Sequence, residues 1–180
     1  MKKLFIIISA IILLSSCSTI LTDSVSAKLV PDVDIKRYAG LWYQVGRYPH
    51  FFQSDDCSES TAEYTLLENG KIEVLNRCWT DYYGGEYSSE VRAAGTPVNE
   101  QGNWLKVVFY GLFPADYLIV ELDYENYSWA AVTTPSEETL WILSRETFLP
   151  EEVYSAIVSS LESKGFDRTK IIKTSGQRDL

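Results

Sequence analysis

The sequence predicts an all-β fold, an eight-stranded antiparallel up-and-down barrel (a calyx) with one C-terminal external α-helix. From residue 40 onward, runs of roughly seven to nine residues rich in β-branched and aromatic side chains alternate with turn-like stretches such as Glu68-Asn69-Gly70. Short connections make neighbouring strands antiparallel, and eight such strands close into a barrel wide enough for one small ligand. One amphipathic helical pattern follows the last strand. A two-sheet sandwich with the same strand count stays open as an alternative.

The composition is that of a one-domain globular protein, because 46% of the 180 residues are hydrophobic and no linker or repeat divides the chain. The chain has 16 basic and 25 acidic residues, a net charge of -9. Nucleic-acid binding needs a basic stripe, which this sequence lacks, so no nucleic-acid partner is expected. The acidic excess is expected to serve solubility.

The N-terminus has the features of an export signal. Met1-Lys2-Lys3 precedes an apolar run over 4–14 that is too short for a spanning helix of about 20 residues. The run ends in Leu14-Ser15-Ser16-Cys17, which resembles the lipobox of bacterial lipoproteins, whose cysteine is lipidated after cleavage. We therefore expect a signal peptide over 1–16, a lipidated tether over 17–30 and a folded domain over 31–180. Ser18 stands where an aspartate favours inner-membrane retention, which points to the outer membrane of a Gram-negative cell.

The expected strands cover 41–48, 60–67, 71–79, 87–95, 104–110, 116–122, 127–133 and 139–145. In the first, a glycine at position 40 lets another segment approach the indole of Trp42. Alternation then separates two faces of this strand. One face carries Trp42, Gln44, Gly46 and Tyr48, and the other carries Leu41, Tyr43, Val45 and Arg47. The face of Trp42 suits a barrel interior.

The same alternation predicts a mostly apolar lining, which is the composition of a small-ligand cavity. Three later sets share a face: Trp141, Leu143 and Arg145; Leu105, Val107 and Phe109; Tyr117, Ile119 and Glu121. The residues expected to contact ligand are Gln44, Ala62, Tyr64, Val74, Asn76, Val107, Phe109, Tyr117, Ile119 and Trp141. Parity alone does not say which face points inward, so a filled core without a cavity stays open.

The helix is expected to begin at Pro150, where a fixed φ suits the first turn, with Glu151 and Glu152 near the positive end of the helix dipole. Gly165 suits the position after its end. Its apolar stripe, which should pack on the outside of the barrel, contains Val153, Ile157, Val158 and Leu161. A short strand over 170–173 is expected to return to the sheet.

Five motifs occur in order along the folded domain. They are Gly40-Leu41-Trp42-Tyr43; Arg47-Tyr48-Pro49-His50-Phe51-Phe52; Thr61-Ala62-Glu63-Tyr64-Thr65-Leu66 with Asn69-Gly70; Leu122-Asp123-Tyr124 with Tyr127; and Leu140-Trp141-Ile142-Leu143-Ser144-Arg145. With this order and spacing, residues from about 31 to 173 resemble the lipocalin family, in particular its bacterial outer-membrane, apolipoprotein D-like group.

The resemblance implies a calyx whose closed end, the barrel floor, is built from Gly40, Trp42 and Arg145, with the guanidinium over the indole. Such a cation-π pair is physically reasonable for a buried arginine. The resemblance also suggests fatty acids or lysophospholipids as ligands. Gln44 departs from the glutamate that bacterial relatives often carry, which removes a charge if this position faces the cavity.

Cys57 and Cys78 are an even pair in an exported chain, and we expect them to form a disulfide. A tight hairpin centred on Asn69-Gly70 would place Cys78 opposite Thr61, so the bridge needs Cys57 to fold back from the preceding loop. The alternative is a free reactive thiol with the chain's one histidine, His50, as its base.

These observations predict an outer-membrane lipoprotein that binds, stores or transports a lipophilic ligand, with the membrane as a partner through its anchor and a monomer or weak homodimer as its state. No HExxH, GxSxG, P-loop or metal-ligand cluster occurs, so no enzyme, metal or cofactor is expected. Glu59, Glu63 and Glu73 are expected on solvated outer positions. Two alternatives stay open: an interaction protein that uses exposed aromatics such as Tyr82 and Tyr83, and a cysteine-dependent enzyme.

Overall fold

The fold comes from a computed structural model that describes residues 26–50, 53, 57, 59–80 and 87–174. The expected signal peptide, Cys17 and its tether up to residue 25 lie outside the described residues, as do Tyr82 and Tyr83. Among the described helices, none is long and apolar enough to cross a bilayer.

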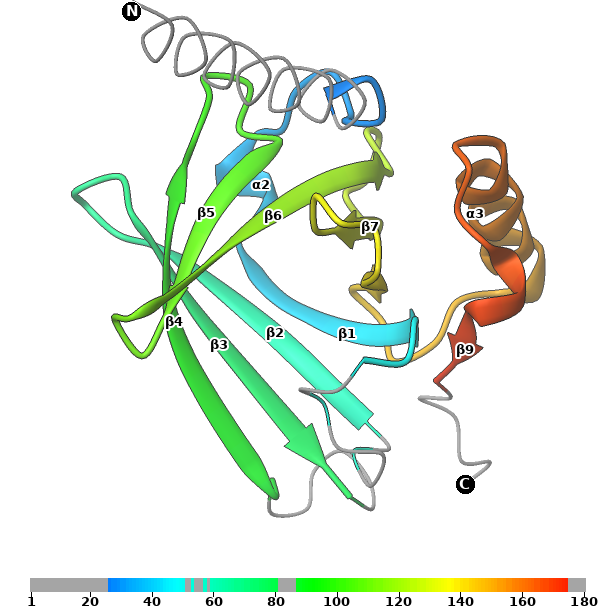
Figure 1. Cartoon of the computed structure of the whole chain (residues 1–180), viewed down its shortest axis with the longest axis horizontal. Coiled ribbons are helices and arrows are strands. Elements are labelled where there is room, and N and C mark those ends of the chain that lie inside the picture. Colours follow the sequence, from blue (N-terminus) through cyan, green and yellow to red (C-terminus); the bar gives the residue numbers. More distant parts are fainter. Residues whose placement is uncertain (1–25, 51–52, 54–56, 58, 81–86, 175–180) are drawn as a thin grey trace, which may run out of the picture.

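The predicted barrel is confirmed (Figure 1). Every strand is antiparallel to its neighbours, and β1 closes the barrel because it pairs with both β2 and β8. A short ninth strand adds to the edge of β1. The strands are β1 Gly40–Arg47, β2 Glu59–Leu66, β3 Ile72–Trp79, β4 Ser89–Pro97, β5 Trp104–Phe109, β6 Phe113–Leu122, β7 Trp129–Thr133, β8 Leu140–Ser144 and β9 Ile172–Lys173.

Two predicted boundaries were wrong. The turn between β5 and β6 was expected at 113–115, but Phe113 already pairs with Phe109, and the chain reverses over 110–112. Positive φ angles at Tyr110 and Gly111, 52° and 71°, make this reversal. The last strand was expected over 170–173, whereas a 3-10 helix occupies Arg168–Lys170 and delays the strand to residue 172.

The predicted C-terminal helix is confirmed as α3, Glu151–Ser163, which packs on the outside of the barrel (Figure 1). Its buried side chains are Tyr154, Ile157, Val158 and Leu161. Gly165 follows the helix with a φ of 91°, as expected for a residue after a C-terminus. A further short helix, α2 Ile35–Tyr38, was not predicted; the Asp34 side chain caps it by accepting from two of its backbone amides.

Irregular pairing in β1 and β6 changes which side chains face the interior. In β1 the register shifts between Gln44 and Gly46. Val45 and Tyr48 therefore belong to the outer cluster beneath α3, and a Cβ on Gly46 would lie 2.8 Å from the Tyr154 hydroxyl. The predicted inward positions of Gly46 and Tyr48 were wrong, because a bulge reverses alternation beyond it.

A similar shift in β6 falls between Ile119 and Glu121. Tyr117 and Ile119 face inward as predicted, but Glu121 turns outward. There it pairs with Lys164, at 3.0 Å, and accepts a hydrogen bond from Ser160 of α3. The bulge therefore gives the helix a polar attachment to the barrel wall.

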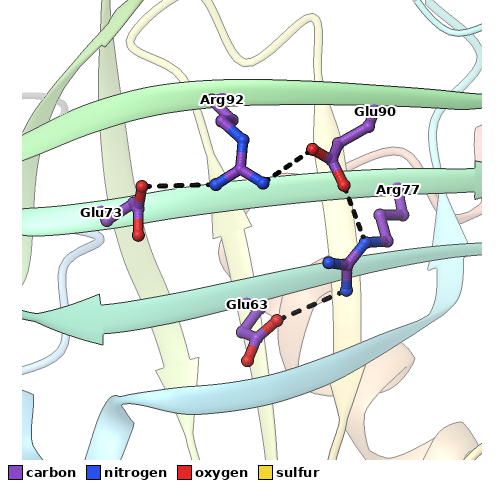
Figure 2. Close-up of polar contacts among 5 residues, drawn as sticks. All are labelled: Glu63, Glu73, Arg77, Glu90 and Arg92. Atoms are coloured by element: carbon purple, nitrogen blue, oxygen red, sulfur yellow. Dashed lines mark hydrogen bonds and ion pairs between the residues drawn. The ribbon is translucent and has the colours of Figure 1, made fainter.

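Figure 2 shows a chain of ion pairs on the outer face of β2, β3 and β4. It runs from Glu63 through Arg77, Glu90 and Arg92 to Glu73, with distances of 2.9 to 3.5 Å. Glu63 and Glu73 thus lie outside, as predicted. Glu59 does not fit that prediction, because its side chain is buried.

Candidate functional site

The barrel interior gathers the residues that were predicted to line it. Tyr64, Val74, Val107 and Ile119 belong to the inner hydrophobic cluster, and Ala62, Phe109, Tyr117 and Trp141 pack against it. Gln44 and Asn76 share this face, because their cross-strand partners Leu143 and Ala62 belong to the same group. The structure thus brings the whole predicted set together on one face.

Burial within the interior changes along the barrel. Near the floor, Trp42, Leu105 and Ile119 are fully buried. Phe109 and Trp141, at the ends of β5 and β8 farthest from the floor, are only partly buried. Side chains are therefore packed most tightly at the floor and less tightly at the opposite end.

The floor has the predicted composition. The guanidinium carbon of Arg145 lies 3.7 Å from the centre of the Trp42 ring. Trp42 in turn donates from its indole nitrogen to the carbonyl of Tyr38 in α2. Gly40 has a φ of 101°, and a Cβ there would lie 3.3 Å from the Arg145 guanidinium. The glycine therefore provides the backbone conformation and the space that the arginine needs.

Above the floor, three tyrosine hydroxyls meet inside the barrel. Tyr64 donates to the Tyr117 hydroxyl at 2.8 Å, and Tyr38 and Tyr117 share a hydrogen bond of 2.9 Å. Burial is the main reason that the pKa of each of these tyrosines is raised above its ordinary value. The hydroxyls therefore stay neutral at physiological pH, and Tyr117 is the common partner of the other two.

A second polar group lies farther from the floor, at the end of β1. Arg47 stands opposite Trp141, so its side chain faces the interior, where it is 5% exposed. The His50 ring lies 5.1 Å from the Trp141 ring. Burial and the Arg47 charge lower the pKa of His50 to about 4, so this imidazole is neutral at physiological pH.

Arg47 was not among the predicted interior residues, because strict alternation placed it on the outer face. The available signal was Gly46, since a glycine inside a strand often marks a bulge. With one residue of slip at this point, Arg47 moves from the outer face to the interior. Gln44, in contrast, was correctly predicted to face inward.

Cys57 and Cys78 form the predicted disulfide, with their Cα atoms 5.6 Å apart. Cys78 lies opposite Ser60 rather than Thr61, because the β2–β3 connection holds a register one residue away from the tight hairpin that was expected. Cys57 reaches it from the segment before β2. Neither cysteine is a free thiol, so the thiol-catalyst alternative loses its nucleophile.

A hollow of about 540 Å³ lies outside the barrel, between the start of β7, the end of β8 and the start of α3. Its wall includes Trp129, Phe148 and Val153. Asp123, also on this wall, already accepts hydrogen bonds from Ser128 and from backbone amides of its own loop. We interpret this hollow as the seam between helix and barrel, and we place the candidate site in the interior.

The chain matches the family model of the lipocalin-like domain over residues 33–176. Outer membrane lipoprotein Blc of Vibrio cholerae is 36% identical over 172 residues, which cover 96% of this chain and 97% of that protein. Temperature-induced lipocalin-1 of Arabidopsis thaliana is 32% identical, with 86% and 85% covered. Apolipoprotein D of Mus musculus is 34% identical, with 78% and 76% covered.

Among solved structures, lobster apocrustacyanin A1 superimposes with a TM-score of 0.60 at 19% sequence identity, over 84% of this chain and 92% of that one. This likeness concerns the fold. The family model covers most of the chain, and the relatives exceed 30% identity over most of their length. With its closed barrel, arginine-capped tryptophan and external helix, the chain belongs to the lipocalin family, in the group that includes the bacterial Blc lipoproteins and apolipoprotein D.

Proposed function

We propose that the protein is an outer-membrane lipoprotein that binds a lipophilic ligand inside its barrel and stores or transports it. The observation that carries this proposal is the interior: a mostly apolar face, packed tightly at the floor and less tightly at the opposite end, where Phe109 and Trp141 are only partly buried. The bacterial relatives are named as outer membrane lipoproteins, which supports the same location for this chain. The lipobox that ends in Cys17 supplies the expected anchor.

The mechanism is equilibrium binding without chemistry. An acyl chain that enters the barrel leaves water along Val107, Phe109 and Trp141, and each buried methylene contributes about 0.8 kcal/mol. A fatty acid or lysophospholipid has one chain and one polar head, which suits a barrel with a closed floor. The disulfide supports a binding protein over a thiol enzyme. We further propose that the folded domain over 31–180 acts as a monomer or weak homodimer.

The first test is native mass spectrometry of the protein purified from the envelope of Gram-negative cells. The lipids that co-purify with it are then identified. A stoichiometric acyl lipid is expected. Titration of the emptied protein with single-chain lipids should also change its intrinsic tryptophan fluorescence, because Trp141 faces the interior. A protein that is empty on isolation and binds none of the lipids would refute the proposal.

Matched substitutions locate the binding. Ala93 faces the inner cluster, whereas its neighbour Ala94 is exposed on the outside. Ala93→Phe fills interior space and should weaken lipid binding at least tenfold, and Ala94→Phe should leave it within about twofold. Circular dichroism verifies that both variants fold. Equal effects of the two substitutions would place the ligand elsewhere.

One observation favours a second candidate function, that of an interaction protein. The β5–β6 turn presents Tyr110, Leu112 and Phe113, which are 68%, 76% and 65% exposed. A patch of this kind can mark a surface for a partner. If the barrel is the functional site, substitution of Leu112 and Phe113 by Ser should leave both lipid affinity and function in the cell unchanged. If the protein acts through a partner, the same double substitution should abolish its function in the cell without changing lipid affinity.

A further inference from the structure

Arg47 has an unusual position for a charged side chain, because the β1 bulge turns it into the barrel. Gly46 faces the outer residues Tyr154 and Ile142, so the next side chain points to the opposite face. Its cross-strand partner Trp141 packs against the inner cluster. The charge of Arg47 also helps to lower the pKa of His50, which itself contacts Trp141. These observations agree that the guanidinium lies inside.

The guanidinium has few acceptors in the part of the chain that the structure describes. Its Nη1 donates to the Tyr48 carbonyl at 3.4 Å, and its Nε, although buried, has no hydrogen-bond partner. None of the ion pairs among the described residues includes it. Burial of a charge without a counter-ion is costly, so an interior arginine in this state calls for an anion.

Arg145 shows how this chain satisfies an arginine that has only a structural role. Its guanidinium nitrogens donate five hydrogen bonds, to the carbonyls of Leu41, Arg37, Tyr38, Ala39 and Tyr127. Arg47, which is more deeply buried, makes one long hydrogen bond to a carbonyl of the described residues. Among the described residues, the Arg47 guanidinium therefore keeps donors that an acceptor from a ligand can use.

Among the described residues, the surroundings of Arg47 add a second donor, and the nearby His50 ring adds no positive charge. Gln44, at the preceding inward position of β1, has a buried side-chain nitrogen that finds no hydrogen-bond partner within the described ranges of the chain. His50 is neutral at physiological pH and brings no charge of its own. Two neighbouring donors, one of them cationic, match an oxyanion, and a guanidinium suits carboxylate and phosphate oxygens in particular.

We propose that Arg47 and Gln44 form an anion subsite on the inner wall, which holds the carboxylate or phosphate head of a single-chain lipid. This inference rests on the proposed function and names its ligand class. β1 runs from the floor at Trp42 to Arg47 at the opposite end, so the apolar lining lies between the subsite and the floor. The ligand therefore enters tail first, with its acyl chain toward Ile119 and its head beside Arg47.

The test compares three lipids that share one chain length: tetradecanoate, tetradecanoyl lysophosphatidate and the neutral 1-monotetradecanoylglycerol. Each is titrated by calorimetry at neutral pH into the chain produced from Ser18 onward, which lacks both the expected signal peptide and Cys17 and therefore needs no detergent. Both anions should bind at least tenfold more tightly than the neutral lipid, a difference of about 1.4 kcal/mol. The tighter of the two anions identifies the head group as carboxylate or phosphate.

Arg47→Gln should abolish the preference for anionic lipids, while its affinity for the neutral lipid stays within about twofold of the parent value. Arg47→Lys keeps the positive charge and should retain most of the preference. Arg92→Gln removes the same charge from the outer surface, where Arg92 is 59% exposed, and should bind like the parent chain. Two outcomes overturn the anion subsite alone. In one, Arg47→Gln still prefers the anionic lipids; in the other, the parent chain binds the neutral lipid but shows no preference for the anionic ones. If none of the three lipids binds, the proposed function fails as well.

A stability measurement distinguishes the subsite from a structural role. Without ligand, Arg47→Met should unfold at the same urea concentration as the parent chain or a higher one, because it removes an unpaired buried charge at similar volume. A clear fall in the urea midpoint would show that Arg47 holds the barrel together, and would overturn the inference.

Discussion

The guanidinium of Arg145 covers the Trp42 ring at 3.7 Å. It also donates hydrogen bonds to the backbone carbonyls of Arg37, Leu41 and Tyr127, and so joins the end of β8 to α2, to β1 and to the loop between β6 and β7. Arg145→Gln should therefore lower the free energy of unfolding by about 2 to 4 kcal/mol, because it removes the cation-π contact and several charge-assisted hydrogen bonds. The stability of Arg145→Lys should lie between those of the parent protein and Arg145→Gln, since an ammonium cannot reach all of these carbonyls. Urea unfolding followed by fluorescence measures the change.

Arg168→Gln is the matched control. Arg168 pairs with Glu162 at 3.2 Å, but both side chains are about half exposed, so the loss should stay below about 1 kcal/mol. Similar midpoints for Arg145→Gln and Arg168→Gln would mean that the floor arginine contributes no more than a surface ion pair.

The floor also depends on Gly40, and its substitution tests the space that Arg145 occupies. Gly40→Ala combines a positive φ with a Cβ placed 3.3 Å from the guanidinium. Gly70→Ala has the positive φ alone, because nothing lies within 4 Å of its Cβ position. Gly40→Ala should cost about 1 kcal/mol more than Gly70→Ala, because both share the cost of a strained backbone and only Gly40→Ala must also displace a packed group. Equal thermal midpoints would contradict this.

The barrel itself could be predicted because each strand carries its own signal: alternation, β-branched residues and a turn at either end. The role of Gly40 in the floor could likewise be predicted, because this glycine stands directly before the Leu41-Trp42-Tyr43 part of its motif. The bulges at Val45 and Val120 left a weaker trace, since one inserted residue changes no composition. They decide the facing of Arg47 and Glu121, which alternation therefore assigned to the wrong sides.

The tyrosine group gives a prediction about coupling. Tyr117→Phe removes the partner of two buried hydroxyls, those of Tyr38 and Tyr64, and should cost about 2 to 4 kcal/mol of stability. Tyr64→Phe leaves the Tyr38–Tyr117 hydrogen bond in place and should cost about 1 kcal/mol. The double variant should be no less stable than Tyr117→Phe alone, because it leaves one orphaned hydroxyl in place of two. Additive losses in urea unfolding would rule out this coupling.

The site was predictable in its apolar part and unpredictable in its polar part. Val74, Val107 and Ile119 follow from strand parity, which depends only on neighbouring residues. The meeting of three tyrosine hydroxyls depends on α2, β2 and β6 together, and the isolation of the Arg47 guanidinium depends on which acceptors are missing around it. Such relations between distant segments appear only once the barrel is closed.

His50 gives the last prediction, a pH dependence of stability. Burial and the nearby Arg47 charge lower its pKa to about 4 in the folded protein, whereas an unfolded histidine titrates near 6.5. Between these values the unfolded chain binds a proton that the folded chain does not, so acidification from pH 6.5 to about 4 lowers the free energy of unfolding. Above pH 6.5 this contribution is fully present, and below about pH 4 it falls no further.

His50→Gln removes that contribution but leaves every carboxylate unchanged. The difference in urea midpoint between the two proteins should be constant above pH 7 and should change in favour of the variant from pH 6.5 to 4. Because His50 is the only histidine in the chain, its imidazole resonance can be followed directly by NMR. Arg47→Gln should raise the pKa that this resonance reports, since the repelling charge is gone, while burial keeps it below 6.5. An imidazole that titrates near 6.5 in the parent protein would place His50 in water and away from Arg47.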